Sequence, residues 1–163
     1  MAYEAAMREA LLLAAETTTH ADVPVGALVL DAAGDVIGTG YNTRERDDDP
    51  TGHAEINAIR AASEARHSWR LEGCTLVVTL EPCTMCAGAI VGARLERLVF
   101  GAYDEKAGAV GSLWDVVRDR RLNHRPEVVA GVLADESSAL LRAFFADHRS
   151  QAVGPEWGGP PGV

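Results

Sequence analysis

The spacing of apolar residues along the chain predicts helices that alternate with strands. In residues 2–17, alanine and leucine recur along one helical stripe, which predicts an N-terminal helix. The apolar runs 25–30 and 35–42 flank the turn sequence DAAG, which contains Gly34, and this arrangement predicts a β-hairpin. The charged segment RERDDDP that follows is expected to be a loop.

The second half of the chain continues the alternation. The alanine-rich run 53–66 favours a helix. Residues 74–80 are apolar on both faces apart from threonines, as expected of a strand in the interior of a sheet. A helix is expected to open at Pro82, because its missing N–H does no harm at a helix start. The remaining predicted elements are strands at 95–101 and 128–133 and a closing helix at 135–149.

This order of elements predicts a layered α/β domain. A chain of 163 residues forms one domain with a substantial core. The predicted elements fall within residues 1–150. Residues 151–163 form a Pro/Gly-rich C-terminal tail without a core pattern.

Charge and hydropathy limit the cellular location and the binding partners that the sequence allows. No stretch is long and apolar enough to span a bilayer, and the acidic N-terminal segment lacks the order of a signal peptide, so we expect a cytoplasmic protein. The net charge of −9 disfavours loose binding to nucleic acid. The sequence RDRRLNHR (118–125) is the exception, with four arginines and one acid, and is either a solvated loop or a track for phosphates.

The cysteines point to metal chemistry. Three cysteines are an odd number, which argues against a disulfide framework. Cys83 and Cys86 are spaced to share one face at a helix start, where the helix dipole lowers the pKa of thiols and favours the thiolate that binds metals. Taken alone, this pair is equally compatible with a redox pair or two buried thiols. His53, which opens another predicted helix, is the natural third ligand for zinc.

Combined with the cysteine pair, His53 and Glu55 favour a catalytic zinc site over a redox pair or two buried thiols. A redox protein has no use for His-x-Glu, and a structural zinc site would need a fourth ligand, whereas Cys74 is expected to be buried in a strand. Three protein ligands with an open fourth position are typical of catalytic zinc. Glu55 lies about 200° around the helix from His53. Both can serve one site only if two helix N-termini face each other across the ion, with Glu55 as the proton carrier.

At these residues the chain resembles the zinc-dependent nucleobase deaminases, whose signature contains His-x-Glu and Pro-Cys-x-x-Cys. The blocks DPTGHAEI, TLEPCTMCAGAI, VFGAYDEKAGAVGSLWD and NHRPEVV are similar to those of bacterial tRNA adenosine deaminases, and the similarity covers residues 3–149. The resemblance implies a three-layer α/β/α cytidine-deaminase-like fold with a central five-stranded mixed sheet. It also implies a homodimer that converts adenosine to inosine in the tRNA anticodon stem-loop, with the target base flipped out of its stack.

The resemblance assigns roles to particular residues. His53, Cys83 and Cys86 would bind one Zn²⁺ per subunit, with Glu55 as general acid and base. Asn42 would contact the base, since an amide both donates and accepts. The neighbouring nucleotides would be held by Asp104, Lys106 and Tyr103, which stands where arginine is common and can stack on a base. The candidate phosphate contacts are Arg118, Arg120, Arg121 and Arg149.

Two other functions stay open on sequence grounds. A deaminase of small free bases or nucleosides, of the guanine, cytosine or triazine type, would share the zinc chemistry and need no basic track. Three consecutive acids, Asp47, Asp48 and Asp49, precede the His-Ala-Glu helix and would repel an RNA backbone. A catalytically idle zinc-binding or RNA-binding protein is the third possibility, and Glu55 argues against it.

Overall fold

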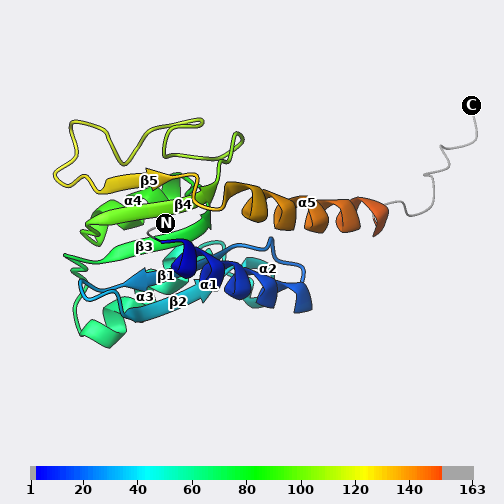
Figure 1. The fold of residues 1–163 in the computed structure, drawn as a ribbon, viewed down its shortest axis with the longest axis horizontal. Helices are drawn as coiled ribbons and strands as arrows, with labels where there is room; N and C mark the ends of the chain where they lie inside the picture. The colour runs from blue at the N-terminus through cyan, green and yellow to red at the C-terminus, as the bar shows by residue number, and fades with distance from the viewer. Residues whose placement is uncertain (1–2, 152–163) are drawn as a thin grey trace, which may run out of the picture.

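The computed structural model describes residues 3–151, and a five-stranded mixed sheet in the order β2-β1-β3-β4-β5 forms their centre (Figure 1). β1 pairs antiparallel with both β2 and β3, whereas β3, β4 and β5 run parallel to one another. The strands are β1 (Gly26–Leu30), β2 (Val36–Tyr41), β3 (Thr75–Leu80), β4 (Arg97–Ala102) and β5 (Glu127–Ala130).

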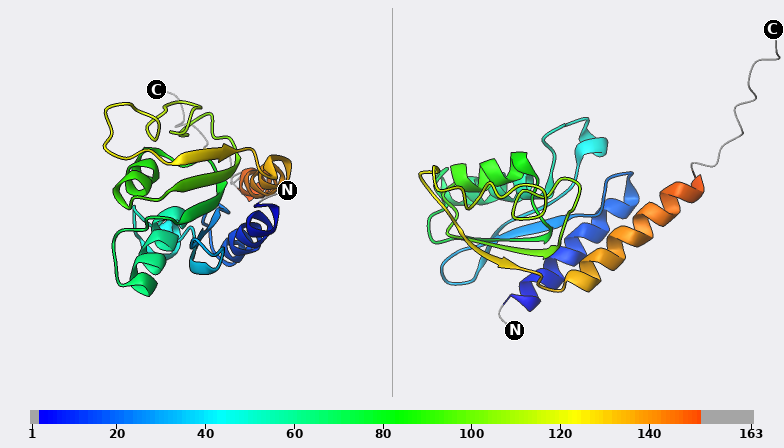
Figure 2. Two further views of the ribbon diagram at one scale, coloured as in Figure 1. Left: turned by 60° about the vertical axis from the view of Figure 1, so that its left-hand side comes forward. Right: turned by 90° about the horizontal axis from the view of Figure 1, so that it is seen from above.

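Helices cover both faces of this sheet. The helices are α1 (Glu4–Ala15), α2 (Arg44–Asp47), α3 (Ala54–Arg66), α4 (Thr84–Gly92) and α5 (Ala134–Gln151), with a 3₁₀ turn η1 (Glu16–Thr19) after α1. Figure 2 shows α1 and α5 side by side on one face, and α3 and α4 on the other. The predicted three-layer α/β/α architecture with a five-stranded mixed sheet is therefore confirmed.

Strand alternation divides the core between the two faces of the sheet. Leu28, Val77 and Val99 point toward α1, where they pack with Met7. The residues of opposite parity in the same strands pack with α3 and α4 in the larger cluster, which includes Phe100. Every residue of β3 except the last is buried, as predicted for an interior strand.

The helix α3 packs unusually close to β2. A Cβ atom built on Gly38 would lie 2.5 Å from the Ala58 oxygen, and one built on Gly40 would lie 2.4 Å from the Ala54 oxygen. The helix presents the methyl groups of Ala54, Ala58 and Ala62, all fully buried, to the two glycines, and the Asn57 Nδ2 donates to the Tyr41 oxygen of the same strand at 2.9 Å. Backbone thus rests on backbone, and the strand fixes the position at which α3 begins.

Three local predictions differ from the structure. The RERDDDP segment is not simply a loop, because the Asp22 carboxylate accepts hydrogen bonds from the N–H groups of Glu45 and Arg46 and supports the one-turn helix α2. The fifth strand ends at Ala130 rather than 133, because Gly131 has a positive φ of 80°. The helix expected to open at Pro82 begins at Thr84.

Two further predictions concern the ends of the chain and the membrane. Residue 151, assigned to the C-terminal tail, is the last residue of α5, and the rest of the predicted tail lies outside the described residues. Within residues 3–151, none of the helices has the length and apolar character needed to cross a membrane.

Candidate active site

The candidate site forms where β3 and β4 end at the same edge of the sheet. Open α/β sheets commonly bind their ligands at the edge formed by the carboxyl ends of the parallel strands. β3 leads directly into Glu81 and Cys83, and β4 leads into the loop that begins at Tyr103. The strand β2 also ends at this edge, because it is antiparallel to β1 and therefore runs in the same direction as β3, and it delivers Asn42 to the cavity described below.

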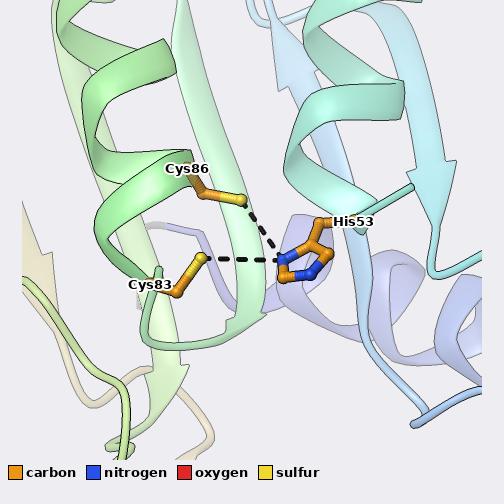
Figure 3. Close-up of side chains that lie close together, drawn as sticks. All are labelled: His53, Cys83 and Cys86. Carbon is orange, nitrogen blue, oxygen red and sulfur yellow. Dashed lines mark hydrogen bonds between the residues drawn. The ribbon is translucent and has the colours of Figure 1, made fainter. Parts of the chain in front are cut away.

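Two helix N-termini face one another at this edge. His53 is the N-cap residue of α3 and Cys83 is the N-cap residue of α4, both with extended backbone. Neither side chain caps its own helix, so the imidazole and the thiol are available to a ligand. Figure 3 shows the His53 ring pointing from α3 toward Cys83 and Cys86 at the start of α4. The predicted arrangement of the two helix starts is confirmed.

The distances among these three side chains suit a zinc ion. The His53 Nδ1 atom lies 3.6 Å from the Cys83 Sγ and 3.6 Å from the Cys86 Sγ, and all three atoms lie within 4.8 Å of one another. With zinc–sulfur and zinc–nitrogen distances of about 2.3 and 2.0–2.1 Å, tetrahedral geometry places sulfur and nitrogen about 3.6 Å apart. One ring nitrogen has at most one proton and cannot serve both sulfurs equally, whereas one shared ion would.

The pKa values of the two cysteines shift in opposite directions, which favours one thiolate beside one thiol. The hydrogen bond from Cys86 lowers the pKa of Cys83 to about 4, and the His53 imidazole adds to this effect. The same hydrogen bond and burial raise the pKa of Cys86. The interaction with Cys83 also raises the pKa of His53. The negative Cys83 thiolate and the His53 imidazole thus stabilise each other at the start of α4. A divalent cation would replace the protons that the cysteine sulfurs and the imidazole share.

Glu55 lies inside the same cavity, in the first turn of α3. Only 4% of its surface is exposed. Burial disfavours the charged carboxylate and raises the pKa of Glu55 to about 7, although a backbone hydrogen bond opposes this effect. A carboxyl group that titrates near neutral pH can both accept and return a proton, which a general acid and base must do.

The cavity has a volume of about 290 Å³ and combines segments from the whole chain. It is small, near the lower end of the range for small-ligand sites. Its lining residues include Asp22, Val23, Asn42, Arg44, His53, Glu55, Glu81, Cys83, Asp104, Lys106 and Phe145.

Asn42 lies in the cavity as predicted, and it also has a structural role. Its Nδ2 donates to the Val23 oxygen at 2.9 Å, and its Oδ1 accepts from the Ala54 N–H at 2.9 Å. The side chain therefore caps α3 from a neighbouring segment. One amide hydrogen and one lone pair remain for a ligand.

Replacing Asn42 with alanine should lower the free energy of unfolding by about 1–2 kcal/mol, because the Ala54 N–H loses its partner at the helix start. Asn42→Asp keeps an acceptor for that N–H but turns a carboxylate oxygen toward the Val23 oxygen, so it should also lose stability. Urea denaturation of both variants measures the difference. Equal stability of Asn42→Ala and the parent chain would contradict the capping role.

Of the predicted substrate contacts in the loop after β4, two line the cavity and one does not. Asp104 and Lys106 line the cavity, and the Asp104 Oδ1 accepts hydrogen bonds from the N–H groups of Lys106 and Ala107. Tyr103 does not line the cavity, although 57% of its surface is exposed. It packs edge-to-face on Phe100, with ring centroids 5.2 Å apart.

The predicted phosphate contacts lie outside the cavity. Arg118 donates to Asp115 at 2.8 Å and to the Val110 oxygen at 3.2 Å. Arg121 forms an ion pair with Asp119, and the guanidinium lowers the pKa of that carboxyl group. Arg120 and Arg149 are both exposed, the latter on α5.

The cavity residues that were not predicted from the sequence include Asp22, Arg44, Glu81 and Phe145. Glu81 lies beside the cysteine motif, and this proximity was the available signal for it, whereas the buried Asp22 lies in the segment that precedes β1. Phe145 comes from α5, and no local pattern distinguishes it from a core residue. It is 46% exposed at the cavity.

An α/β/α sandwich with a three-donor His–Cys–Cys cluster and a buried carboxylate in one cavity defines a zinc-dependent hydrolytic enzyme. Comparison with known proteins narrows this class. Residues 1–102 match the family model for the cytidine and deoxycytidylate deaminase zinc-binding region, and the chain belongs to this family.

Individual relatives are similar over most of the chain. A tRNA-specific adenosine deaminase from Haemophilus influenzae is 48% identical over 148 residues, which cover 91% of this chain and 86% of the relative. A solved structure from work on A-to-I editing by tRNA:A34 deaminases has a TM-score of 0.79 at 43% identity, covering 83% of this chain and 97% of that chain. A guanine deaminase from Nitrosomonas europaea has a TM-score of 0.75 at 29% identity, covering 89% and 85% of the two chains.

Proposed function

We propose that this protein is a hydrolytic, zinc-dependent deaminase that converts adenosine to inosine at the first anticodon position of tRNA. The observation that carries the proposal is one cavity lined by His53, Cys83 and the buried Glu55, with the buried Cys86 completing the three-donor cluster beside it. The tRNA-specific relative at 48% identity favours tRNA over a free base, since the guanine deaminase structure is only 29% identical.

The three donors would hold the zinc ion, and Glu55 would move the proton. When bound, zinc supplies Lewis acidity that lowers the pKa of water and provides a nucleophile near neutral pH. Glu55, protected from solvent and with a pKa of about 7, would accept the proton from water and deliver it to N1 of the purine. Glu55 would next carry the second proton of the water, from the new hydroxyl group on C6, to the amino group. The C6–O bond forms, the C6–N bond breaks, and ammonia leaves.

The remaining contacts would position the nucleotide. Asn42 has one amide hydrogen and one lone pair free for the edge of the purine, beside its two structural bonds. Asp104 and Lys106 line the cavity from the loop that follows β4 and would hold the nucleotides on either side of the target base. Tyr103 is exposed and offers a ring face beyond the cavity on which a flanking base can stack.

The direct test is a screen for ammonia release and base conversion on four substrates: anticodon stem-loop RNA, free adenosine, guanine and cytosine, with zinc content measured alongside. We expect inosine in the RNA and no comparable turnover of the three small substrates. Preferred turnover of guanine or cytosine would instead support the alternative of a free-base deaminase.

The basic segment 118–125 should matter for RNA alone. Replacing both Arg120 and Arg121 with alanine should raise KM for the stem-loop and reduce the slope of log affinity against log salt by about 1.4 to 1.8, if each arginine meets one phosphate. Steady-state kinetics between low and moderate salt measure both effects.

The matched control replaces Arg8 and Arg70, which changes the net charge equally but removes ion pairs with Glu4, Glu136 and Glu72. Its KM should stay near that of the parent chain. Undiminished stem-loop turnover by the Arg120/Arg121 variant at moderate salt would show that this segment is not the phosphate track.

We further propose that the chain acts as a homodimer in the cytoplasm. The exposed side chains of Leu113 and Trp114 provide apolar surface that a second copy would cover. The cysteines Cys74, Cys83 and Cys86 are free thiols, which suits a reducing compartment. Sedimentation equilibrium tests the assembly, and the mass of a single chain at micromolar concentration would contradict it.

A further inference from the structure

Glu81 is a buried carboxylate that the proposed chemistry does not use. It lies between β3 and α4, two residues before Cys83, and only 2% of its surface is exposed. A charged side chain in such a place is costly unless hydrogen bonds satisfy it. Glu81 must therefore have hydrogen-bond donors around both of its carboxylate oxygens.

Its partners all belong to the loop that follows β4. The Glu81 Oε1 accepts hydrogen bonds from the N–H groups of Val110 and Ser112, each at 3.0 Å. The Oε2 accepts from the Asp104 N–H at 3.0 Å and from the Ser112 hydroxyl. One carboxylate thus ties together both ends of residues 104–112, which we call the substrate loop.

The backbone around Glu81 reinforces this attachment. The Glu81 N–H donates to the Ala102 oxygen, and the Pro82 oxygen accepts from the Ala109 N–H, both at 2.8 Å. A Cβ atom on Gly108 would lie 2.4 Å from the Glu81 carboxyl carbon, so the loop closes directly over the carboxylate. The loop segment that carries Asp104 and Lys106 is consequently fixed to the segment that carries Cys83.

We propose that Glu81 is a positioning residue that sets the substrate loop against the metal-binding helix, so that Asp104 and Lys106 meet the nucleotides beside the target base. This inference rests on the proposed function. Glu81 acts through backbone N–H groups, not through contact with the base. Its loss should weaken RNA binding and leave the metal cluster in place.

The test is Glu81→Gln in the full-length chain. The side chain keeps its size, but the new NH₂ group faces N–H and O–H donors in place of an acceptor. We expect KM for anticodon stem-loop RNA to rise about tenfold, as for loss of hydrogen bonds to a charged acceptor, with a smaller change in kcat. Zinc content should stay at the parent level. The backbone amides of Asp104, Val110 and Ser112 should exchange their hydrogens faster.

Glu105→Gln is the matched control, because it removes the same charge from an exposed position in the same loop. Loss of a negative charge near RNA favours binding, so Glu105→Gln should leave KM unchanged or lower it. The two substitutions therefore have opposite expected signs, and charge alone cannot produce a rise in KM for Glu81→Gln.

Three results would overturn the inference. They are a KM for Glu81→Gln that matches the control, unchanged amide exchange in the loop, and loss of zinc from the variant. If Glu81→Gln does not fold, Ser112→Ala removes one of the four donors and should produce the same effects at smaller size. Unchanged KM and exchange in Ser112→Ala would then overturn it. A parent chain that deaminates no RNA contradicts the proposed function instead, while amide exchange still tests the role of Glu81 in the loop.

Discussion

Replacing Glu55 with glutamine should abolish inosine formation and leave the zinc content of the protein unchanged. Glutamine has the size of glutamate but cannot take a proton from water or return one to the purine. General acid and base catalysis contributes roughly 10²–10⁴-fold to rate, and one residue serves both steps here, so we expect a loss at or above the upper end of this range. Single-turnover inosine formation and zinc analysis on the same sample measure the two quantities.

Glu64→Gln is the control for this substitution, because it makes the same change at an exposed position of the same helix. It should leave both rate and zinc content near the parent values. The variant Glu55→Gln should not be less stable than the parent at neutral pH, because it replaces a buried carboxyl group whose charged form is disfavoured. Activity within tenfold of the parent would refute the assigned role of Glu55.

The metal cluster was predictable because its chemistry is local in sequence. Cys83 and Cys86 lie one helical turn apart and His53 stands immediately before a helix, so the metal ligands could be predicted once the cysteine pair was combined with His53 and Glu55. The requirement that His53 and Glu55 share one site then leaves a single arrangement, with both residues at a helix N-terminus. The 3.6 Å distances in the structure agree with it.

The rest of the cavity depends on long-range packing that no local pattern encodes. Phe145 reaches the cavity because α5 packs alongside α1 on the opposite face of the sheet and extends past the edge (Figure 2). The pairing of Arg121 with Asp119 likewise depends on the loop conformation, which reduces the free positive charge that composition suggests. Hydrophobic periodicity predicts the helices and strands, but the residues that line the cavity are determined by how those helices and strands pack together.

The packing of α3 against β2 shows how contacts between elements position a metal-binding residue. The sequence predicts a strand over 35–42 and an alanine-rich helix over 53–66, but neither pattern states that Gly38 and Gly40 face that helix. The structure places them under Ala54, Ala58 and Ala62. Since His53 is the residue before Ala54, the smallness of these side chains determines where the imidazole stands.

Replacing Gly40 with alanine should therefore damage both the fold and the site. The new methyl group would lie 2.4 Å from the Ala54 oxygen and 2.6 Å from the Ala58 nitrogen, and neither backbone atom can rotate away. Overpacking against rigid neighbours costs about 3 kcal/mol of unfolding free energy. To relieve it, the start of α3 must move by about 1 Å, and a displacement of that size at a reacting centre costs about 100-fold in rate. Urea denaturation, zinc content and inosine formation measure the three consequences.

Gly88→Ala makes the same chemical change two residues after Cys86, on the exposed face of α4, where nothing lies within 4 Å of the added atom. Alanine is the better helix former, so this variant should gain about 0.5–1 kcal/mol of stability and keep its zinc. The opposite signs separate a steric effect between α3 and β2 from a general effect of adding a methyl group near the metal ligands. Equal stability of the two variants would mean that α3 does not rest on the backbone of β2.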